Sequence, residues 1–258
     1  MNFGSDKCEV VSVKKTDTEA LSMTEALKIL YQDEWLVAID KPAGHLVHPA
    51  ESPQDDDLVA MKILRDQIGK RVNTIHRIDR PTSGVLLFGL EKQATKKLHK
   101  ALELHDFDKS YWAVVQGKAP AEQWQCHQPI QKEDGAPVRE AHTSFRVLES
   151  RKVEALASLE EQCAGHGDIL TLIEAIPHSG RFHQIRRHLL HADIPIVGDY
   201  RYAGIETCDR IGELLASGTR MLLQAKSLTL DHPITGDKLT ITAPLGPNFL
   251  RCFPSLAE

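Results

Sequence analysis

Short apolar runs recur along the 258-residue chain and are separated by polar or turn-forming residues. Runs that are alternating or continuously apolar predict strands over 27–31, 35–39, 83–90, 109–116, 141–149, 169–175, 220–230 and 238–242. Apolar residues at helical spacing predict helices over 58–68, 91–105 and 180–191. The predicted elements form hairpins with scattered helices, and strands and helices do not alternate regularly. The pattern therefore predicts an α+β fold with a mixed, largely antiparallel sheet and flanking helices.

Polar segments without periodicity set the expected domain organisation. Residues 1–24 predict a flexible N-terminal extension, followed by one domain over 25–258 in which 150–168 forms an irregular insertion. The apolar runs are far too short to cross a bilayer, and the N-terminus lacks the apolar core of a signal peptide. Five scattered cysteines without a C-x-x-C pair favour reduced thiols. A cytoplasmic protein without membrane attachment is expected.

Charge is distributed unevenly around a net charge of −5. Residues 1–59 carry five Lys/Arg against twelve Asp/Glu, whereas 60–115 carry eleven against six. Arg181, Arg186 and Arg187 form a second basic group. These runs indicate either ordinary solvated faces or one basic face that meets a polyanion, and composition alone does not choose between them.

Several common chemistries lack their sequence motifs. The chain contains no P-loop, no complete dinucleotide-binding glycine motif and no serine-hydrolase elbow. A kinase catalytic loop would need His-Arg-Asp contiguous, but Ile78 intervenes here. The histidines at 183, 188 and 191 lack the i, i+4 spacing of a helical zinc site. Neither a metal nor a nucleotide cofactor is expected.

Three stretches carry the candidate chemistry. In His76–Gly84, "HRIDRPTSG", the acid Asp79 lies between Arg77 and Arg80. It could belong to a surface turn held by local ion pairs, or it could be a carboxylate kept ionised because it reacts. The second stretch, 108–115, reads "DKSYWAVV" and places a Lys and a Tyr on one face of a strand. The third, 179–188, reads "SGRFHQIRRH".

Taken together, these stretches resemble the RluA-type pseudouridine synthases, whose motifs are H-R-L-D-x-x-T-S-G, K-x-Y and T-G-R-x-H-Q-I-R. The flanking segments "KPAG" at 41–44, "GDYRYAG" at 198–204 and "MLLQAKSL" at 221–228 occur in the family's order. The resemblance covers about residues 25–245. It implies the pseudouridine synthase fold with a central active-site cleft.

The resemblance also implies roles for individual residues. Asp79 would act at the ribose of a flipped uridine, by attack on C1′ or by deprotonation of C2′, and both routes stay open. Arg186 would keep Asp79 ionised, and Tyr111 would stack on the uracil and help to remove the C5 proton. The substrate-binding residues implied are Arg77, Lys109, Arg181, Gln184 and Leu222, where Leu222 or its neighbour Leu223 forms the apolar floor under the uracil. Further phosphate contacts are implied for some of the lysines of 92–100. No cofactor is implied, and a monomer is expected.

Arg80-Pro81 and the opening "ILYQDEW" at 29–35 are most similar to the TruC branch, which isomerises uridine 65 in the acceptor arm of certain tRNAs. An N-terminal S4 domain, usual in the larger ribosomal-RNA members, is not expected. Alternatives are a pseudouridine synthase for another tRNA or rRNA site and a non-catalytic RNA-binding protein of the same fold. A glycoside hydrolase also acts at an anomeric carbon, but it needs two carboxylates.

The chain departs from the family pattern at four positions. Ile78 and Ser179 replace the usual Leu and Thr, which are mild changes. Asp40 stands where Asn is usual, and Gln224 replaces a common His. The change at 224 puts local contacts of its strand in doubt, but not the chemistry.

Overall fold

The computed structural model describes residues 26–49, 52, 54, 57–157 and 167–257. Their strands form one sheet in the order β1-β2-β4-β9-β5-β8-β7-β6, with β10 paired to β9 and β3 paired to β4. The strands are β1 (Lys28–Gln32), β2 (Leu36–Lys41), β3 (Asn73–Thr74), β4 (Ser83–Gly89), β5 (Asp108–Gln116), β6 (Gln123–Cys126), β7 (Thr143–Lys152), β8 (Ile169–Pro177), β9 (Leu223–Asp231) and β10 (Lys238–Thr242). The helices are α1 (Ala60–Ile68), α2 (Lys92–Glu103), α3 (Glu154–Ala157), α4 (Gln184–His191), α5 (Ile205–Leu214), α6 (Pro247–Cys252) and the 3₁₀ helix η1 (Pro254–Ala257).

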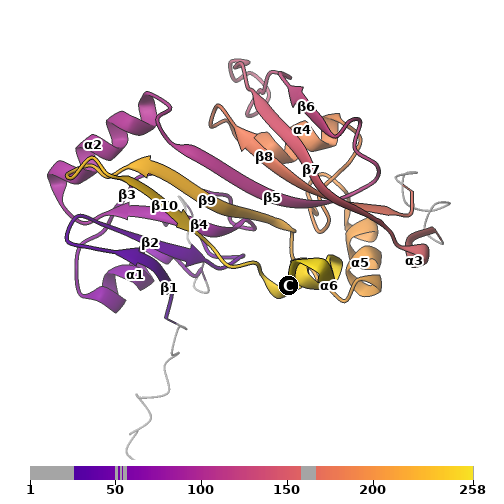
Figure 1. Cartoon of the computed structure of the whole chain (residues 1–258), viewed down its shortest axis with the longest axis horizontal. Coiled ribbons are helices and arrows are strands. Elements are labelled where there is room, and N and C mark those ends of the chain that lie inside the picture. The colour runs from indigo at the N-terminus through magenta and orange to yellow at the C-terminus, as the bar shows by residue number, and fades with distance from the viewer. Residues whose placement is uncertain (1–25, 50–51, 53, 55–56, 158–166, 258) are drawn as a thin grey trace, which may run out of the picture.

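The sheet is antiparallel at every pairing except one. Strands β4 and β9 run parallel where Ser83 faces Gln224 and Gly84 faces Ala225. Near this junction β9 passes from the half that carries α3–α6, where Leu223 packs, to the half that carries α1 and α2, where Leu228 packs in one cluster with Leu98 of α2 (Figure 1). The predicted mixed, largely antiparallel sheet with flanking helices is therefore confirmed.

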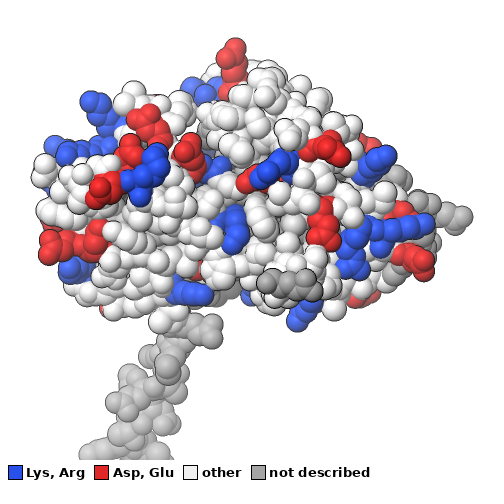
Figure 2. All heavy atoms as spheres, in the orientation of Figure 1, with Lys and Arg blue, Asp and Glu red and all other residues white. Residues whose placement is uncertain are grey.

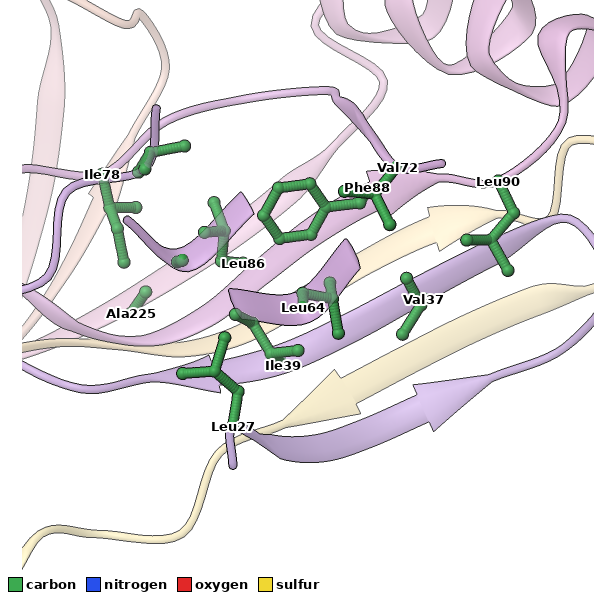
Figure 3. Packing of buried hydrophobic residues seen from close by; sticks show 12 residues of the cluster. Leu27, Val37, Ile39, Leu64, Val72, Ile78, Leu86, Phe88, Leu90 and Ala225 are labelled. Atoms are coloured by element: carbon green, nitrogen blue, oxygen red, sulfur yellow. The ribbon is translucent and has the colours of Figure 1, made fainter. Parts of the chain in front are cut away.

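Side chains of the strands alternate between two faces of the sheet. On one face, Leu64 of α1 packs with Leu86 and Phe88 of β4, and the same cluster reaches Ile78 and Ala225 (Figure 3). The residue before the candidate carboxylate is thus anchored in the core, which limits how far the segment around Asp79 can move.

Helix α4 covers the other half of the same face, where it buries Ile185 and Leu189. Tyr111 contacts both this cluster and the α1 cluster. On the opposite face, Leu98 of α2 and Ile211 of α5 belong to two further clusters. The α1/α4 face is therefore separate from the face that carries α2, α5 and α6.

Several element boundaries differ from the sequence prediction. Strand β6 and helices α5 and α6 were not predicted, because their segments are short or weakly periodic. Residues 150–157 are not irregular: β7 continues to Lys152 and α3 follows, while 158–166 lie outside the described residues. Helix α4 begins at Gln184, since His183 adopts a left-handed φ of 53°. The expected extension 1–24 also lies outside the described residues.

The surface shows no segregation of charge in the orientation of Figure 2, where lysines and arginines are interspersed with acids. The hypothesis of one basic face gains no support from this side of the molecule. Within the described residues, none of the helices is both long and apolar enough to span a membrane.

Gly84 makes the parallel β4–β9 junction possible. Its φ is +103°, and a Cβ atom there would lie 2.2 Å from the carbonyl oxygen of Ala225. This close approach explains why a glycine ends the "HRIDRPTSG" stretch.

We expect Gly84→Ala to lower the free energy of unfolding by at least about 3 kcal/mol, because backbone strain adds to a clash with another strand. Gly236→Ala is the matched control: its φ is +77° but no atom lies within 4 Å of the added Cβ, so the cost should be only about 1–2 kcal/mol. Urea unfolding of both variants measures the difference. Equal losses would show that the close approach is unimportant.

Candidate active site

The three motif stretches meet on the α1/α4 face of the sheet. Asp79 lies in a turn before β4, closed by a 3.0 Å hydrogen bond from the Thr82 N–H to the Asp79 carbonyl. Tyr111 comes from β5 and Arg186 from the first turn of α4. Residues far apart in the sequence thus line one region, because the β4–β9–β5 strand order brings their elements together.

The strongest polar contact of the site joins Arg186 to Asp199. The Arg186 Nε and one terminal nitrogen each donate to a different Asp199 oxygen at 2.7 Å. The side chains are 5% and 1% exposed, so this is a buried, bidentate pair. Such pairs fix the plane of the guanidinium as well as its position.

Asp79 receives only the remaining nitrogen of that guanidinium, Nη1, which donates to Asp79 Oδ2 at 3.3 Å. The Asp79 side chain is 30% exposed. Within the described residues, its Oδ1 has no hydrogen-bond or ion-pair partner. The arginine charge is thus shared with Asp199, and Asp79 keeps one oxygen available for chemistry.

The environment keeps Arg186 charged. Burial lowers the pKa of the guanidinium, but its hydrogen bonds to Asp199 and the charges of both acids raise that pKa by more. The guanidinium carbon also lies 5.0 Å from the centre of the Tyr202 ring, in cation–π range. Arg186 is therefore a permanently charged, immobile neighbour of Asp79.

His183 approaches Asp79 as a neutral ring. Its Nε2 lies 3.9 Å from Asp79 Oδ2, and its Nδ1 lies 3.0 Å from the Tyr202 hydroxyl. Burial, followed by the charges of Arg186 and Arg201, lowers the pKa of His183 to about 3. At neutral pH the ring adds no second positive charge, and it can offer at most one N–H.

Two cavities share Asp79 as part of their walls. The Tyr111 cavity, about 330 Å³, is lined among others by Asp79, Lys109, Tyr111, Arg181 and Leu223. The Arg201 cavity, about 480 Å³, is lined among others by Asp79, His48, Tyr200, Arg201 and Met221. The expected central cleft thus consists of two adjoining spaces with the free carboxylate between them.

Comparison with known proteins shows what this chain is similar to. A family model described as RNA pseudouridylate synthase matches residues 35–191. The tRNA pseudouridine synthase C of Salmonella typhi is 39% identical over 235 residues, covering 87% of this chain and 88% of the relative. The protein of the same name from Pasteurella multocida is 37% identical, covering 87% and 93%.

This chain belongs to the RNA pseudouridylate synthase family. Human RNA pseudouridylate synthase domain containing 4 has a similar fold, with a TM-score of 0.66 at 23% identity over 89% of this chain and 93% of that one. The predicted family and fold are confirmed, and the protein is an RNA-modifying isomerase.

Tyr111 lines the smaller cavity together with Asp79. Burial and the charge of Asp79 raise the pKa of its phenol well above the usual value. The hydroxyl therefore stays protonated at neutral pH and is better suited to stacking or hydrogen-bond donation than to taking a proton. The apolar wall of this cavity comes from Leu223, whereas Leu222 lies in the α5/α6 cluster on the opposite face. Of the two leucines expected at this wall, the structure therefore places Leu223 in the cavity and not Leu222.

Two of the expected substrate-binding residues, Arg77 and Lys109, line the Tyr111 cavity and have side-chain nitrogens available to a ligand. Arg77 is exposed, lines both cavities and has no partner within the described residues. Lys109 is half-buried, and burial lowers its pKa.

Arg181 and Gln184 are more firmly held. Arg181 donates from Nε to the Glu140 carbonyl at 2.9 Å but stays exposed. Gln184 is buried, accepts from Ser179 Oγ and the Arg181 N–H, and donates to the His142 carbonyl and Thr143 Oγ1. Since all of these partners belong to the protein, Gln184 holds the 179–183 segment in place. The lysines of α2, in contrast, belong to an element on the opposite face.

Lys41 connects two loops of the site. Its buried Nζ donates to the carbonyls of Pro42, His45 and Arg80 at 2.8, 2.9 and 3.1 Å. Burial lowers its pKa to about 7, against the raising effect of the Asp79 charge. The "KPAG" segment is therefore structural, and it steadies the turn that follows Asp79.

Asp199 was not among the residues predicted from the sequence, although its segment "GDYRYAG" was noted as a family-like flank. A lone acid in a loop gives no sign of which arginine it pairs with. The sequence feature that could have identified Asp199 is an acid in a glycine-rich flanking segment, shortly after a helix rich in arginine.

We expect Asp199→Asn to lower the free energy of unfolding by about 3 kcal/mol, because it leaves Arg186 buried without its main counter-charge. The isomerisation rate should fall at least tenfold, since Arg186 becomes free to engage both Asp79 oxygens. Asp231→Asn removes an exposed acid paired to Lys238 at 3.4 Å and should cost less than about 1 kcal/mol. Unfolding and single-turnover rates equal to those of this control would contradict the role of Asp199.

His76 makes the stability of the folded protein depend on pH. Its Nε2 accepts the Leu87 N–H at 3.1 Å, and burial together with the charge of Lys109 lowers its pKa to about 3. The unfolded chain binds this proton near pH 6.5, so stability is lost as pH falls from about 6.5 towards 3. We expect His76→Gln to reduce the slope of stability against pH in that window by up to about 1.4 kcal/mol per unit. Urea unfolding at pH 7, 6 and 5 tests this, and an unchanged slope would rule it out.

Proposed function

We propose that this enzyme isomerises uridine to pseudouridine in tRNA, at uridine 65 of the acceptor arm. The curated relatives described above, named tRNA pseudouridine synthase C, support tRNA as the substrate. The Arg80-Pro81 pair and the opening "ILYQDEW" support the position within the tRNA. We also propose that the protein works in the cytoplasm as a monomer.

The observation that carries this proposal is the placement of Asp79. Its Oδ2 is held by Arg186, while its Oδ1 has no partner within the described residues and the side chain borders the Tyr111 cavity. A carboxylate with one fixed and one free oxygen can act as a nucleophile or a base on a ribose that it faces. Among the described residues that line the Tyr111 cavity, Asp79 is the only acid, whereas a hydrolase pair needs two.

The reaction conserves every atom. The bond from uracil N1 to ribose C1′ breaks, and a bond from uracil C5 to C1′ forms. The proton on C5 leaves, and N1 gains a proton. No oxidant, reductant or cofactor is required, because substrate and product are isomers.

Each side chain then has a defined task. Asp79 either attacks C1′ and forms an ester, or removes the C2′ proton to give a glycal. Tyr111 stacks on the uracil while the base turns, and Leu223 provides the apolar wall beside it. Arg77, exposed at the mouth of both cavities, takes the place of the flipped nucleotide in the RNA stack. Lys109 and Arg181 contact the backbone phosphates on the side of the Tyr111 cavity.

We expect Asp79→Asn to abolish pseudouridine formation while the dissociation constant for tRNA changes less than about threefold, because only a reacting oxygen is lost. Single-turnover assays on an unmodified tRNA transcript measure the product, and filter binding measures affinity. Retained turnover would remove Asp79 from the mechanism. A transcript with cytidine in place of uridine 65 is the substrate control, and product from it would refute the position while leaving the reaction intact.

A further inference from the structure

The Arg201 cavity has no task in the mechanism above, although it is the larger of the two spaces beside Asp79. The shared wall between the cavities is built from two chain segments, 77–79 and 182–183, together with Arg186. A ribose that faces Asp79 therefore lies at the boundary between the two spaces. With its base in the Tyr111 cavity, such a ribose would have the Arg201 cavity on its other side.

The lining of the Arg201 cavity combines an apolar floor with a cationic rim. Leu46, Val47 and Met221 contribute apolar surface. Arg201 is exposed and has no carboxylate partner within the described residues. Among the described lining residues, the acids are Asp79 and Asp199, and Asp199 is already compensated by Arg186.

The other two arginines of the rim differ in freedom. Arg80 is fixed by the Gly44 carbonyl, which accepts from its Nε at 2.9 Å, and by Asp57 at 3.2 Å. Arg77 is unpaired within the described residues. Because the proposed mechanism places Arg77 in the RNA stack, the rim offers one fixed guanidinium, Arg80, and one adjustable guanidinium, Arg201, to a phosphodiester that runs across it.

A stacked column forms the wall between the two cavities. The Arg201 guanidinium lies 5.7 Å from the centre of the Phe182 ring, and that ring stacks on His183 at 3.7 Å with planes 20° apart. His183 is in turn fixed by Tyr202. Since nucleobases stack on aromatic rings and on guanidinium planes, the column extends naturally by one base on the Arg201 side.

From these observations we infer that the Arg201 cavity binds the nucleotide next to the target uridine, with its base on the apolar floor beside Arg201 and its phosphate at the arginine rim. This inference rests on the proposed function. It makes the recognised unit a dinucleotide, both of whose bases leave the RNA stack.

The test is a coupling experiment between the RNA and the protein. Three RNA stem-loops that contain the target uridine are used: one unmodified, one abasic on the 5′ side of the target and one abasic on the 3′ side. Each is assayed for single-turnover isomerisation and for binding by fluorescence anisotropy. The proteins are the wild type, Arg201→Ala, and Arg201→Lys, which keeps the charge but not the planar group.

For the wild type, we measure the single-turnover rate constant divided by the protein concentration at half-saturation. We expect this ratio to fall about tenfold for one of the abasic RNAs, which is the size of one base–side-chain stack. The same RNA should lose less than about twofold with Arg201→Ala, because the partner of the missing base is already gone. Arg201→Lys should lie between the two. Arg65→Ala, on the exposed surface of α1, is the matched control and should respond like the wild type.

Equal losses for wild type and Arg201→Ala at both flanking positions, in rate and in binding, would overturn the inference. Product formed without such coupling leaves the proposed function intact and removes only the second nucleotide site. Absence of product from every RNA with the wild type would instead contradict the proposed function.

Discussion

The site depends on one buried ion pair. Arg186 gives two of its nitrogens to Asp199 at 2.7 Å and only one, at 3.3 Å, to Asp79. A guanidinium committed wholly to Asp79 would neutralise it and occupy both oxygens. Because Asp199 takes the tight, desolvated part of the interaction, Asp79 is oriented and stays partly free. The buried acid Asp199 thus keeps the second acid, Asp79, reactive.

The fold delivers this pair through a single parallel contact in an otherwise antiparallel sheet. At Gly84, β4 approaches β9 so closely that only a glycine fits, and the Asp79 turn immediately precedes it. Ile78 anchors the same turn in the α1 cluster, while Lys41 binds the carbonyl of Arg80 just behind it. The carboxylate therefore stands at the junction of the two halves, between elements that come from both.

Apolar alternation predicted most of the strands, because it is a local property. The resemblance to a known family, carried by ordered local motifs, pointed to Asp79, Tyr111 and Arg186. The remaining features are not local. Asp199 pairs with an arginine thirteen positions away, which no periodicity encodes. The choice of Leu223 over Leu222 depends on the strand register, and β5 shifts register against β9 between Ser110 and Tyr111. The left-handed His183, which delays the start of α4, depends on tertiary packing. The α2 lysines lie on the opposite face because Leu98 packs there.

The central claim is most directly tested by the structure of the protein bound to an RNA stem-loop that contains the target uridine. The account predicts an everted uridine with its base on Tyr111, its ribose C1′ and C2′ next to Asp79 Oδ1, and Arg186 still paired through two nitrogens with Asp199. A complex in which Arg186 leaves Asp199, or in which the everted ribose lies away from Asp79, would contradict it.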